Sequence, residues 1–339
     1  MKKIKLGIVG GGYIAQVCHM PHIYKNKNIE IVAIAEKNKS LLNKISKKYQ
    51  IKNKFIDYKN IVEEKIKIDA VIICLNKFLT SKISNYFLKN KISVFSEKPL
   101  AINYKDAKNL FSISKKNKVK MIVGYMKRHD HGTNLIKNII KSKKMGELKK
   151  INYDSLMGDS FPKKYKFIKY VKPFVKVSLK SVVNKKIIAS KRPDYIDFLN
   201  THSHGINLLR HYIGDKYKFY INKKININNT IELKANNKII MFSFRYNTKN
   251  PWKEKVTLNF DNGKITQLFM APILRNRSSK VTVNFFSDTK PKIFEKNIWP
   301  FKKQTDEFVK TILINKKNIC DIKNCIYDIK LIEKIFSKK

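Results

Sequence analysis

The sequence predicts an α/β protein with two domains. A doubly wound parallel sheet comes first, and an α/β domain with a mostly antiparallel open sheet and C-terminal helices follows. Three observations carry this prediction: apolar, β-branched runs alternate with helix-period segments up to residue 124, a glycine-rich turn follows the first run, and runs of alternating polarity begin at residue 149. With 339 residues and 43% hydrophobic side chains, the chain is long enough for two cores. We place the domains at residues 1–124 and 125–339.

The N-terminal part shows the strand–helix alternation of βαβ units. Helices are expected over residues 41–49, over residues 81–89, and from the N-cap Asn103 to about residue 116. The expected strands are Ile4–Val9, Ile29–Ala35, Ala70–Leu75, Ser93–Phe95 and Lys120–Gly124.

The first expected strand ends in three consecutive glycines, which begin the pattern Gly-x-Gly-x-x-Ala. Gly10 allows a tight turn, Gly12 lets backbone N–H groups approach a pyrophosphate at the helix N-terminus, and Ala15 keeps the helix close to the strand. This strand–turn–helix is typical of a Rossmann dinucleotide-binding domain. It makes Tyr13 and Ile14, at the start of the helix, candidate cofactor contacts.

Glu36 ends the second expected strand, about 20 positions after Ala15. A carboxylate at this spacing accepts hydrogen bonds from the ribose hydroxyls of adenosine, which favours NAD as the cofactor. Lys37 and Lys39 follow directly and would tolerate a 2′-phosphate, so NADP is the second choice. The alternative for Glu36 is a solvated carboxylate at a strand end.

Ligands of parallel sheets bind beyond the carboxyl ends of the strands, which places the chemistry near residues 10–15, 74–80 and 96–100. The last of these windows holds Glu97 and Lys98, followed by a proline. A lysine fixed at this point would hydrogen-bond a substrate hydroxyl beside a nicotinamide, and Glu97 would hold it in place. The alternative is an ordinary strand-end lysine.

Several short motifs follow one another along the chain. They are the glycine-rich turn with Ala15, His19-x-Pro21, Glu97-Lys98-Pro99, Gly124-Tyr125-x-x-Arg128, Met145-Gly146-Glu147-Leu148 and His204-x-x-Asn207-Leu208-Leu209-Arg210. Taken in this order, the motifs resemble the Gfo/Idh/MocA family of NAD(P)-dependent oxidoreductases over essentially the whole chain. The resemblance implies hydride transfer between NAD(P) and a secondary hydroxyl or keto carbon of a sugar, an inositol-like polyol or a sugar derivative. It also implies an open sheet that carries substrate on one side and often an oligomer interface on the other, and hence a homodimer or homotetramer.

By this resemblance Lys98 falls on the family's active-site lysine, His204 on its catalytic histidine, and Asn200 where many members carry aspartate. Oxidation of a carbinol requires a base for the hydroxyl proton, and histidine suits this near neutral pH. In a helix expected over residues 201–213, His204 lies one turn after Asn200, so we expect both side chains to face the same way. The alternative for His204 is a hydrogen-bonded core histidine.

Asn200 can orient a substrate or a histidine, but it cannot offer a negative charge. The alternative function is therefore a catalytically degenerate, dinucleotide-binding regulatory or binding protein. Members of the family also commonly have proline and then histidine where this chain has Asn76 and Thr80, although the backbone there is still expected to contact the cofactor. The candidate cofactor contacts are Gly10, Gly12, Tyr13, Ile14, Glu36, Lys37, Leu75, Asn76, Glu97 and Lys98. The candidate substrate contacts are Tyr125, Arg128, Asn200 and His204.

The second half of the chain is predicted to form antiparallel strands followed by helices. Asp261-Asn262-Gly263 lies between two strand-like runs and indicates a hairpin. Residues 158–195 show no clear periodicity, and we interpret them as an insertion or loop region, or a lid. Apolar stripes over residues 308–313 and 322–336 predict two packing helices. The strand-like runs are Lys149–Met157, Thr230–Lys234, Ile239–Tyr246, Lys255–Phe260, Ile265–Met270 and Val281–Phe286.

A formal net charge of +48 is typical of proteins that bind nucleic acid or an anionic membrane surface. Only six of the 73 basic residues are arginine, and the lysines are spread along the whole chain, so we expect no dedicated nucleic-acid binding. No run approaches the ~20 apolar residues of a membrane helix, and Lys5 breaks the first apolar stretch, so a cytoplasmic protein without a signal peptide is expected. The four scattered cysteines predict free thiols, and the inferred chemistry needs no metal.

Overall fold

The computed structural model describes residues 3–159, 177–214, 217–223, 225 and 229–337. The chain forms two compact units that alternate along the sequence. The described residues within Met1–Tyr125, Lys164–Asn200 and Gln304–Lys330 form the first unit, and those within Met126–Lys163, Thr201–Lys303 and Leu331–Lys339 form the second. The first break falls after Tyr125, and two later segments group with the first unit.

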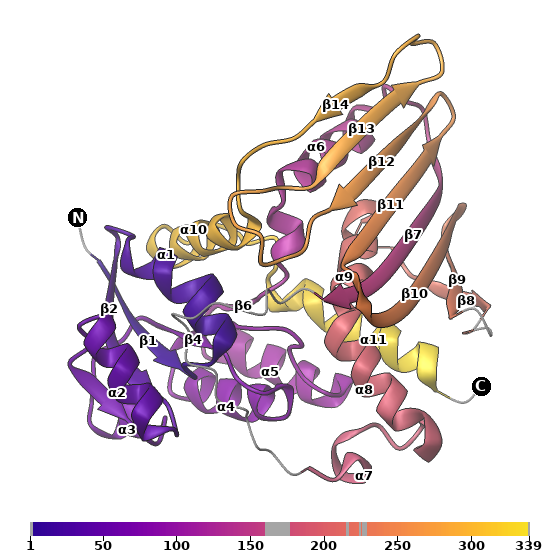
Figure 1. Cartoon of the computed structure of the whole chain (residues 1–339). Coiled ribbons are helices and arrows are strands. Elements are labelled where there is room, and N and C mark those ends of the chain that lie inside the picture. The colour runs from indigo at the N-terminus through magenta and orange to yellow at the C-terminus, as the bar shows by residue number, and fades with distance from the viewer. Residues whose placement is uncertain (1–2, 160–176, 215–216, 224, 226–228, 338–339) are drawn as a thin grey trace. The chain divides into compact units, whose positions relative to one another are not determined.

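A six-stranded, all-parallel sheet forms the centre of the first unit, with the strand order β3-β2-β1-β4-β5-β6 (Figure 1). In this doubly wound order the chain changes its direction of growth between β1 and β4, and ligands bind beyond the carboxyl ends of the strands at that point. Leu6, Ile8 and Val71 have no exposed surface, as expected for strands covered on both faces. The strands are β1 (Ile4–Val9), β2 (Ile29–Ala35), β3 (Asn53–Phe55), β4 (Ala70–Ile73), β5 (Ser93–Ser96) and β6 (Met121–Val123).

Asparagine caps decide where three helices of this unit begin. The side chains of Asn38, Asn76 and Asn103 each accept a hydrogen bond from a backbone N–H of the first helical turn. The helix expected after Asn103 is confirmed at both ends, whereas the other two begin earlier than predicted because their caps precede the apolar residues. The helices are a π-helix, η1 (Ala15–His19), followed by α1 (Met20–Tyr24), α2 (Lys39–Lys48), α3 (Asn60–Glu63), α4 (Lys77–Lys89) and α5 (Tyr104–Lys116).

An eight-stranded sheet forms the second unit, in the order β14-β13-β12-β11-β7-β10-β9-β8. All neighbouring strands are antiparallel except β7 and β10, so the prediction of a mostly antiparallel sheet is confirmed. The predicted hairpin is also confirmed, because β11 and β12 pair from Phe260 opposite Gly263. The strands are β7 (Leu148–Asp159), β8 (Tyr220–Lys223), β9 (Thr230–Ala235), β10 (Lys238–Pro251), β11 (Lys253–Phe260), β12 (Gly263–Phe269), β13 (Lys280–Phe285) and β14 (Lys292–Phe294).

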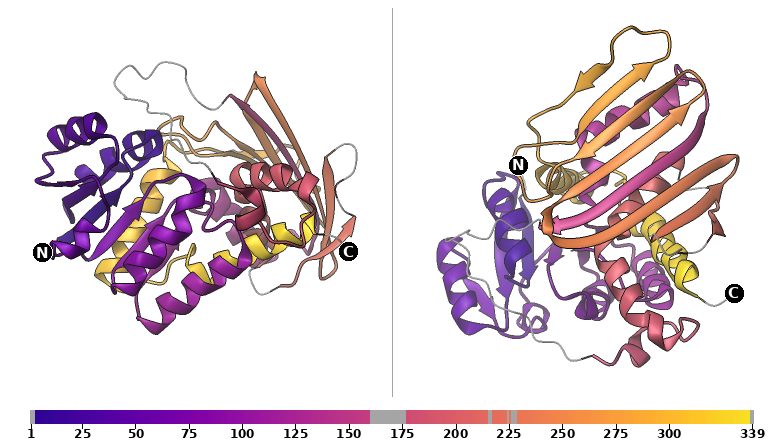
Figure 2. Two further views of the ribbon diagram at one scale, coloured as in Figure 1. Left: turned by 90° about the horizontal axis from the view of Figure 1, so that it is seen from below. Right: turned by 45° about the vertical axis from the view of Figure 1, so that its right-hand side comes forward.

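One face of this sheet is buried and the other is open. Tyr153 and Ser155 of β7 are buried, whereas the alternate residues Lys150 and Asp154 are exposed. The helices of this unit, α6 (His131–Ser142) and α9 (Ser203–Ile213), lie on the buried face (Figures 1 and 2). The polar residues that point inward from the strands are therefore enclosed beneath helices.

Helical turns and helices make up most of the remaining described chain. Residues 158–195 were interpreted as an insertion or loop. The first two of them belong to the end of β7, residues 160–176 lie outside the described residues, and the rest include short helices. The stripe residues of α11 are buried, whereas Leu313 of α10 is 40% exposed. The buried residues are Ile322, Ile326, Ile329, Ile332 and Phe336. These elements are η2 (Met126–His129), α7 (Leu179–Val182), η3 (Ala189–Lys191), α8 (Arg192–Thr201), α10 (Pro300–Leu313) and α11 (Ile322–Phe336).

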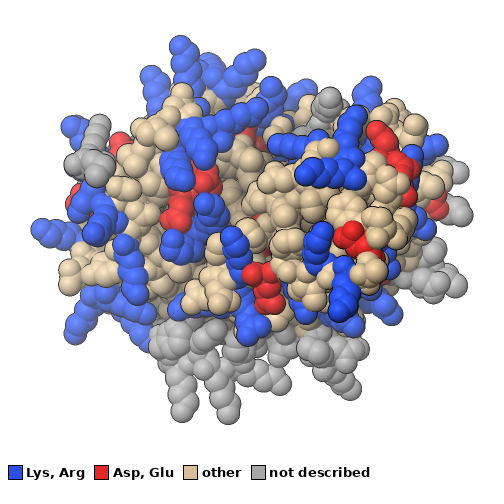
Figure 3. Space-filling view, turned by 90° about the horizontal axis from the view of Figure 1, so that it is seen from above, with Lys and Arg blue, Asp and Glu red and all other residues tan. Residues whose placement is uncertain are grey.

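Basic side chains are scattered over the face of the molecule shown in Figure 3, with few acidic side chains among them. They do not gather there into one stripe. Among the described residues, no helix combines the length and apolar character needed to cross a membrane.

Candidate cofactor site and active site

The turn after β1 accepts only glycine at its first position. Gly10 has a φ of +90°, and a Cβ there would lie 2.3 Å from the carbonyl oxygen of Cys74 and 2.7 Å from the side chain of Leu75. The Gly10 N–H donates to the carbonyl oxygen of Ala35 at 2.9 Å. The turn is therefore held directly against the carboxyl ends of β2 and β4.

Gly12, at the start of the helix, borders open space instead. A Cβ at this position would meet no atom within 4 Å. Tyr13 and Ile14 begin the helix and are partly exposed, while Ala15 is fully buried beneath them. An accessible, Cβ-free backbone at a helix N-terminus fits a dinucleotide pyrophosphate, because N–H groups and the helix dipole both favour an anion there.

Glu36, at the tip of β2, points back to the glycine-rich turn. Its carboxylate accepts hydrogen bonds from the N–H of Gly11 at 2.7 Å and from the N–H of Asn38 at 2.9 Å. The next residue, Lys37, is exposed. The carboxylate thus lies beside the turn, where a Rossmann domain holds the ribose of adenosine.

Leu75 and Asn76 connect β4 to α4. Asn76 is the N-cap of α4, and its side chain accepts from the N–H of Phe78 at 3.1 Å. Thr80 is only 1% exposed, and its hydroxyl donates to the carbonyl oxygen of Asn76 at 3.3 Å. Both polar side chains therefore stabilise the first turn of α4.

Glu97 and Lys98 follow β5 and are tied to other parts of the first unit. The Lys98 Nζ donates to the backbone carbonyl of Asn200 at 2.5 Å, across 102 positions of the chain. The Glu97 carboxylate accepts from the N–H of Lys98 at 3.2 Å and lies 2.7 Å from the ring of His19. The structure thus brings together two of the three predicted catalytic residues, Lys98 and Asn200, through the main chain of Asn200.

The helix predicted over residues 201–213 is interrupted. The helix α8 ends at Thr201, His202 forms a turn, and α9 begins at Ser203. Asn200 and His204 therefore lie in two successive helices, and the expectation that their side chains face the same way stays a prediction. His202 is fully buried with its Nδ1 3.2 Å from the Ser155 hydroxyl, and this bond to the sheet accompanies the break. His204, the second residue of α9, remains partly exposed.

Tyr125 and Arg128 have no exposed surface. The Arg128 guanidinium donates to the side chain of Asn207 at 2.7 Å and to its carbonyl oxygen at 3.1 Å. These bonds fix η2 to α9 and favour a positioning role for Arg128. Contact of either residue with a substrate stays a prediction.

The sequence reasoning missed a buried charge cluster in the second unit. The Lys127 Nζ lies 2.5 Å from both carboxylate oxygens of Glu254 and 3.2 Å from the hydroxyl of Tyr153. Burial lowers the pKa of the Lys127 ammonium, and Glu254 opposes that shift. A signal was present in the sequence, because Glu254 shares its strand phase with the inward-facing Val256 and Leu258.

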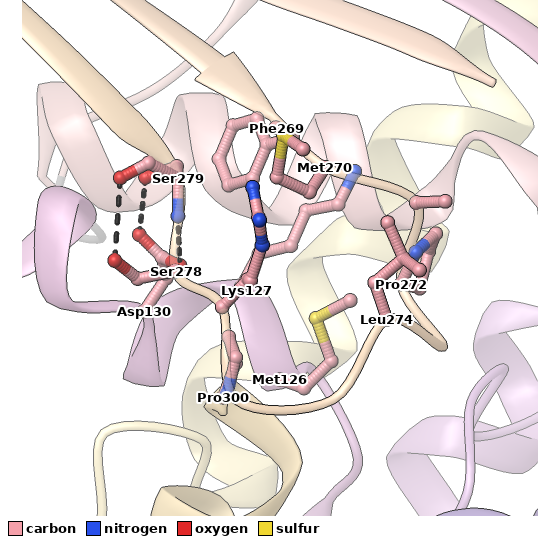
Figure 4. A pocket seen from close by; sticks show the side chains of 12 residues that line it. Met126, Lys127, Asp130, Phe269, Met270, Pro272, Leu274, Ser278, Ser279 and Pro300 are labelled. Carbon is pink, nitrogen blue, oxygen red and sulfur yellow. Dashed lines mark hydrogen bonds between the residues drawn. The ribbon is translucent and has the colours of Figure 1, made fainter. Parts of the chain in front are cut away.

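Lys127 and Asp130 also line a small pocket of the second unit (Figure 4). The Asp130 carboxylate accepts from the N–H of Ser279 at 2.9 Å and from the Ser279 hydroxyl, and it caps α6 through the N–H of Thr133. Burial raises the pKa of Asp130, and these hydrogen bonds oppose the shift. In the described part of the chain, no group of three or more His, Cys, Asp or Glu side chains could hold a metal ion.

The strand order, the glycine turn and the carboxylate at the tip of β2 together define the first unit as a Rossmann domain built for a dinucleotide. Residues 4–125 match a family model described as "Oxidoreductase family, NAD-binding Rossmann fold". Over this region the chain is similar to the Gfo/Idh/MocA family of oxidoreductases, which agrees with the resemblance seen in its motifs.

Known proteins similar to this chain agree with that assignment. Inositol 2-dehydrogenase of Salmonella typhimurium is 30% identical over 150 residues, which span 42% of this chain and 43% of that protein. The match therefore covers less than half the length of this curated relative.

Solved structures extend the likeness in fold to nearly the whole chain. A 3-ketoreductase from Actinomadura kijaniata, in complex with NADP and TDP-benzene, matches 98% of this chain and 96% of its own, with a TM-score of 0.74 and 13% identity. An oxidoreductase from Agrobacterium radiobacter, in complex with NAD+, L-tartaric acid and magnesium, matches 98% of this chain and 95% of its own, with a TM-score of 0.72 and 14% identity. At these identities the likeness establishes the fold alone.

Proposed function

We propose that the protein is an NAD(P)-dependent oxidoreductase that acts on a secondary hydroxyl or keto carbon of a sugar, an inositol-like polyol or a sugar derivative. The observation that carries this proposal is the set of groups at the carboxyl ends of β1, β2 and β5: an open glycine turn, the Glu36 carboxylate and the Lys98 ammonium. The names of the relatives, an inositol 2-dehydrogenase and a 3-ketoreductase, support the substrate class.

The cofactor residues favour NAD. Glu36 would accept hydrogen bonds from ribose hydroxyls, and a 2′-phosphate would meet its negative charge. Exposed Lys37 offers a cation to such a phosphate, which keeps NADP as the second cofactor. When bound, the nicotinamide supplies the acceptor or donor of the hydride.

Three residues would perform the remaining chemistry. Lys98 would donate a hydrogen bond to the reacting oxygen and polarise it, since an ammonium carries three donor hydrogens. His204 would take the hydroxyl proton during oxidation and return it during reduction. Asn200 would orient the substrate through its amide. By analogy with the family we further propose a homodimer or homotetramer.

A dinucleotide-binding protein without turnover is the second candidate. Two observations favour it: Asn200 lacks the charge of the aspartate that many family members carry, and Asn76 and Thr80 are engaged in capping α4. Such a protein would bind NAD as tightly as the enzyme does, so binding alone does not separate the two functions.

The test combines cofactor binding with turnover. Purified protein is titrated with NAD and NADP by calorimetry, and reduced nicotinamide is then followed by stopped-flow absorbance with a panel of inositols, polyols, sugars and sugar nucleotides. We expect Lys98→Ala and His204→Ala to lower kcat/KM by about 100-fold or more, and His204→Ala to change NAD affinity by less than about 3-fold.

The outcomes separate the candidates. Substrate-dependent reduction of NAD that both substitutions abolish supports the oxidoreductase. Tight NAD binding without turnover across the panel supports the second candidate, and absence of binding to either dinucleotide contradicts both.

A further inference from the structure

His19 and Glu97 form a buried pair that contacts the main chain of Lys98. The Nε2 of His19 lies 2.7 Å from the Oε1 of Glu97, although the two residues are 78 positions apart. His19 is 1% exposed and Glu97 is 9% exposed. A carboxylate can only accept a hydrogen bond, so with Glu97 ionised the proton of this bond belongs to His19 Nε2.

The two oxygens of Glu97 hold different partners. Oε1 contacts His19, while Oε2 accepts from the backbone N–H of Lys98 at 3.2 Å. Gly124 leaves room for the carboxylate, since a Cβ at that position would lie 3.0 to 3.2 Å from its atoms. The carboxylate is therefore clamped between the histidine and the main chain of the lysine.

The local fold explains how His19 reaches this position. Residues Ala15–His19 form a π-helix, in which the N–H of Met20 donates to the carbonyl of Ala15. This wider turn is rare, and single π-turns are frequent at functional sites. The His19 ring also packs edge-on against Phe95 of β5 with ring centroids 5.4 Å apart. His19 thus contacts the end of β5 on both sides of Ser96.

We propose that His19 is a positioning residue for Lys98. By donating to Glu97 Oε1 it fixes the carboxylate so that Oε2 holds the Lys98 backbone, which in turn sets where the Lys98 ammonium lies. This inference rests on the proposed function of Lys98 in catalysis, and it assigns the His19-x-Pro21 motif a role in the same site. His19 itself touches neither substrate nor cofactor in this assignment.

Two substitutions separate the hydrogen bond from the bulk of the ring. His19→Gln places an amide nitrogen as far along the side chain as Nε2, so it can still donate to Glu97. His19→Asn is its matched control, because its amide nitrogen corresponds to Nδ1 and falls short of Glu97. Loss of a hydrogen bond to a charged group predicts that His19→Asn slows the hydride-transfer step about 10- to 100-fold, with KM changed less than about 3-fold. We expect His19→Gln to stay within about 3-fold of wild type in both constants.

A second readout does not depend on dehydrogenase activity. Acylation of Lys98 by acetic anhydride in the free protein, measured by peptide mass spectrometry relative to exposed Lys105, reports how firmly the ammonium is held. We expect this ratio to rise at least about 3-fold in His19→Asn and to stay at the wild-type value in His19→Gln. Glu97→Asp, which shortens the carboxylate by one methylene, should raise the ratio in the same way and serves if His19→Asn does not fold.

A merely structural role gives a different pattern. In that case both His19 variants lower the melting temperature, Lys98 acylation stays unchanged relative to Lys105, and His19→Gln does not restore the hydride-transfer rate. That pattern overturns the inference. If the wild type shows no turnover, the proposed function fails, and the acylation ratios alone decide the role of His19.

Discussion

The buried Lys127–Glu254 pair offers a residue-scale test of what holds the second unit together. Lys127 is 2% exposed and Glu254 is 1% exposed, and breaking such a pair leaves an uncompensated charge in the interior. We expect Lys127→Met to lower the free energy of unfolding by about 3 kcal/mol or more, as measured by urea denaturation. The double variant Lys127→Met, Glu254→Leu removes both charges and should recover most of that loss; equal losses in the single and double variants would contradict this account.

The raised pKa of Asp130 predicts that its contribution to stability changes with pH in the direction opposite to that of a carboxylate with a lowered pKa. Because burial raises its pKa above the ordinary value of 3.8, the folded state binds the proton more strongly than the unfolded state does. The stability that this residue contributes therefore falls as the pH rises from 3.8 through its raised folded pKa. We expect the difference in unfolding free energy between the wild type and Asp130→Asn to shrink over that range in urea titrations. A difference that grows with pH would refute the burial effect.

At the scale of elements, the glycine-rich turn holds two glycines with different expected roles: Gly10 is required by the fold, and Gly12 by cofactor binding. A side chain at Gly10 collides with the Cys74 carbonyl at positive φ, so Gly10→Ala should lower the free energy of unfolding by about 2 kcal/mol or more. A side chain at Gly12 meets nothing, so Gly12→Ala should change stability by less than about 0.5 kcal/mol. We nevertheless expect it to weaken NAD binding about 10-fold, because the new methyl group stands where the pyrophosphate approaches. Calorimetric titration and chemical denaturation of both variants measure this contrast, and an unaltered NAD affinity in Gly12→Ala would place the pyrophosphate elsewhere.

Elements with strong periodicity or a clear cap were predictable, and short ones were not. The strand Ile4–Val9 and the helix after Asn103 have the predicted bounds because an apolar run or a capping side chain marks each end. The strands β3, β8 and β14 were missed, since strands of only three or four residues give no usable period. Pairing with a neighbouring strand stabilises such segments, and that pairing is invisible in the local sequence.

The whole molecule carries a formal net charge of +48, and this excess opposes compaction. Raising the NaCl concentration from about 20 mM to about 300 mM shortens the Debye length from roughly 20 Å to roughly 6 Å. We therefore expect the free energy of unfolding, measured by urea denaturation, to rise over this range. A triple variant that changes the exposed residues Lys150, Lys255 and Lys264 to glutamine should show a smaller rise, whereas an equal or larger rise would show that charge repulsion is not the cause.

The sequence by itself determined the fold class of the protein and the location of its dinucleotide-binding turn. Apolar periodicity and the Gly10 turn are local signals, so they predicted the parallel sheet and the position of Glu36 at a strand end without any knowledge of contacts. The order of the motifs was enough to indicate a resemblance to the Gfo/Idh/MocA family, and residues 4–125 match an oxidoreductase family model.

Only the tertiary structure decided which of these residues meet. The contacts of Lys98 with Asn200 and of His19 with Glu97 join residues 102 and 78 positions apart, and no local pattern encodes such separations. The break at His202 likewise coincides with a bond between a buried imidazole and β7, a contact that helix propensity alone does not predict. Lys127, Glu254 and Asp130 have roles that depend on burial. They are buried only because strands and helices that are distant in the sequence enclose them.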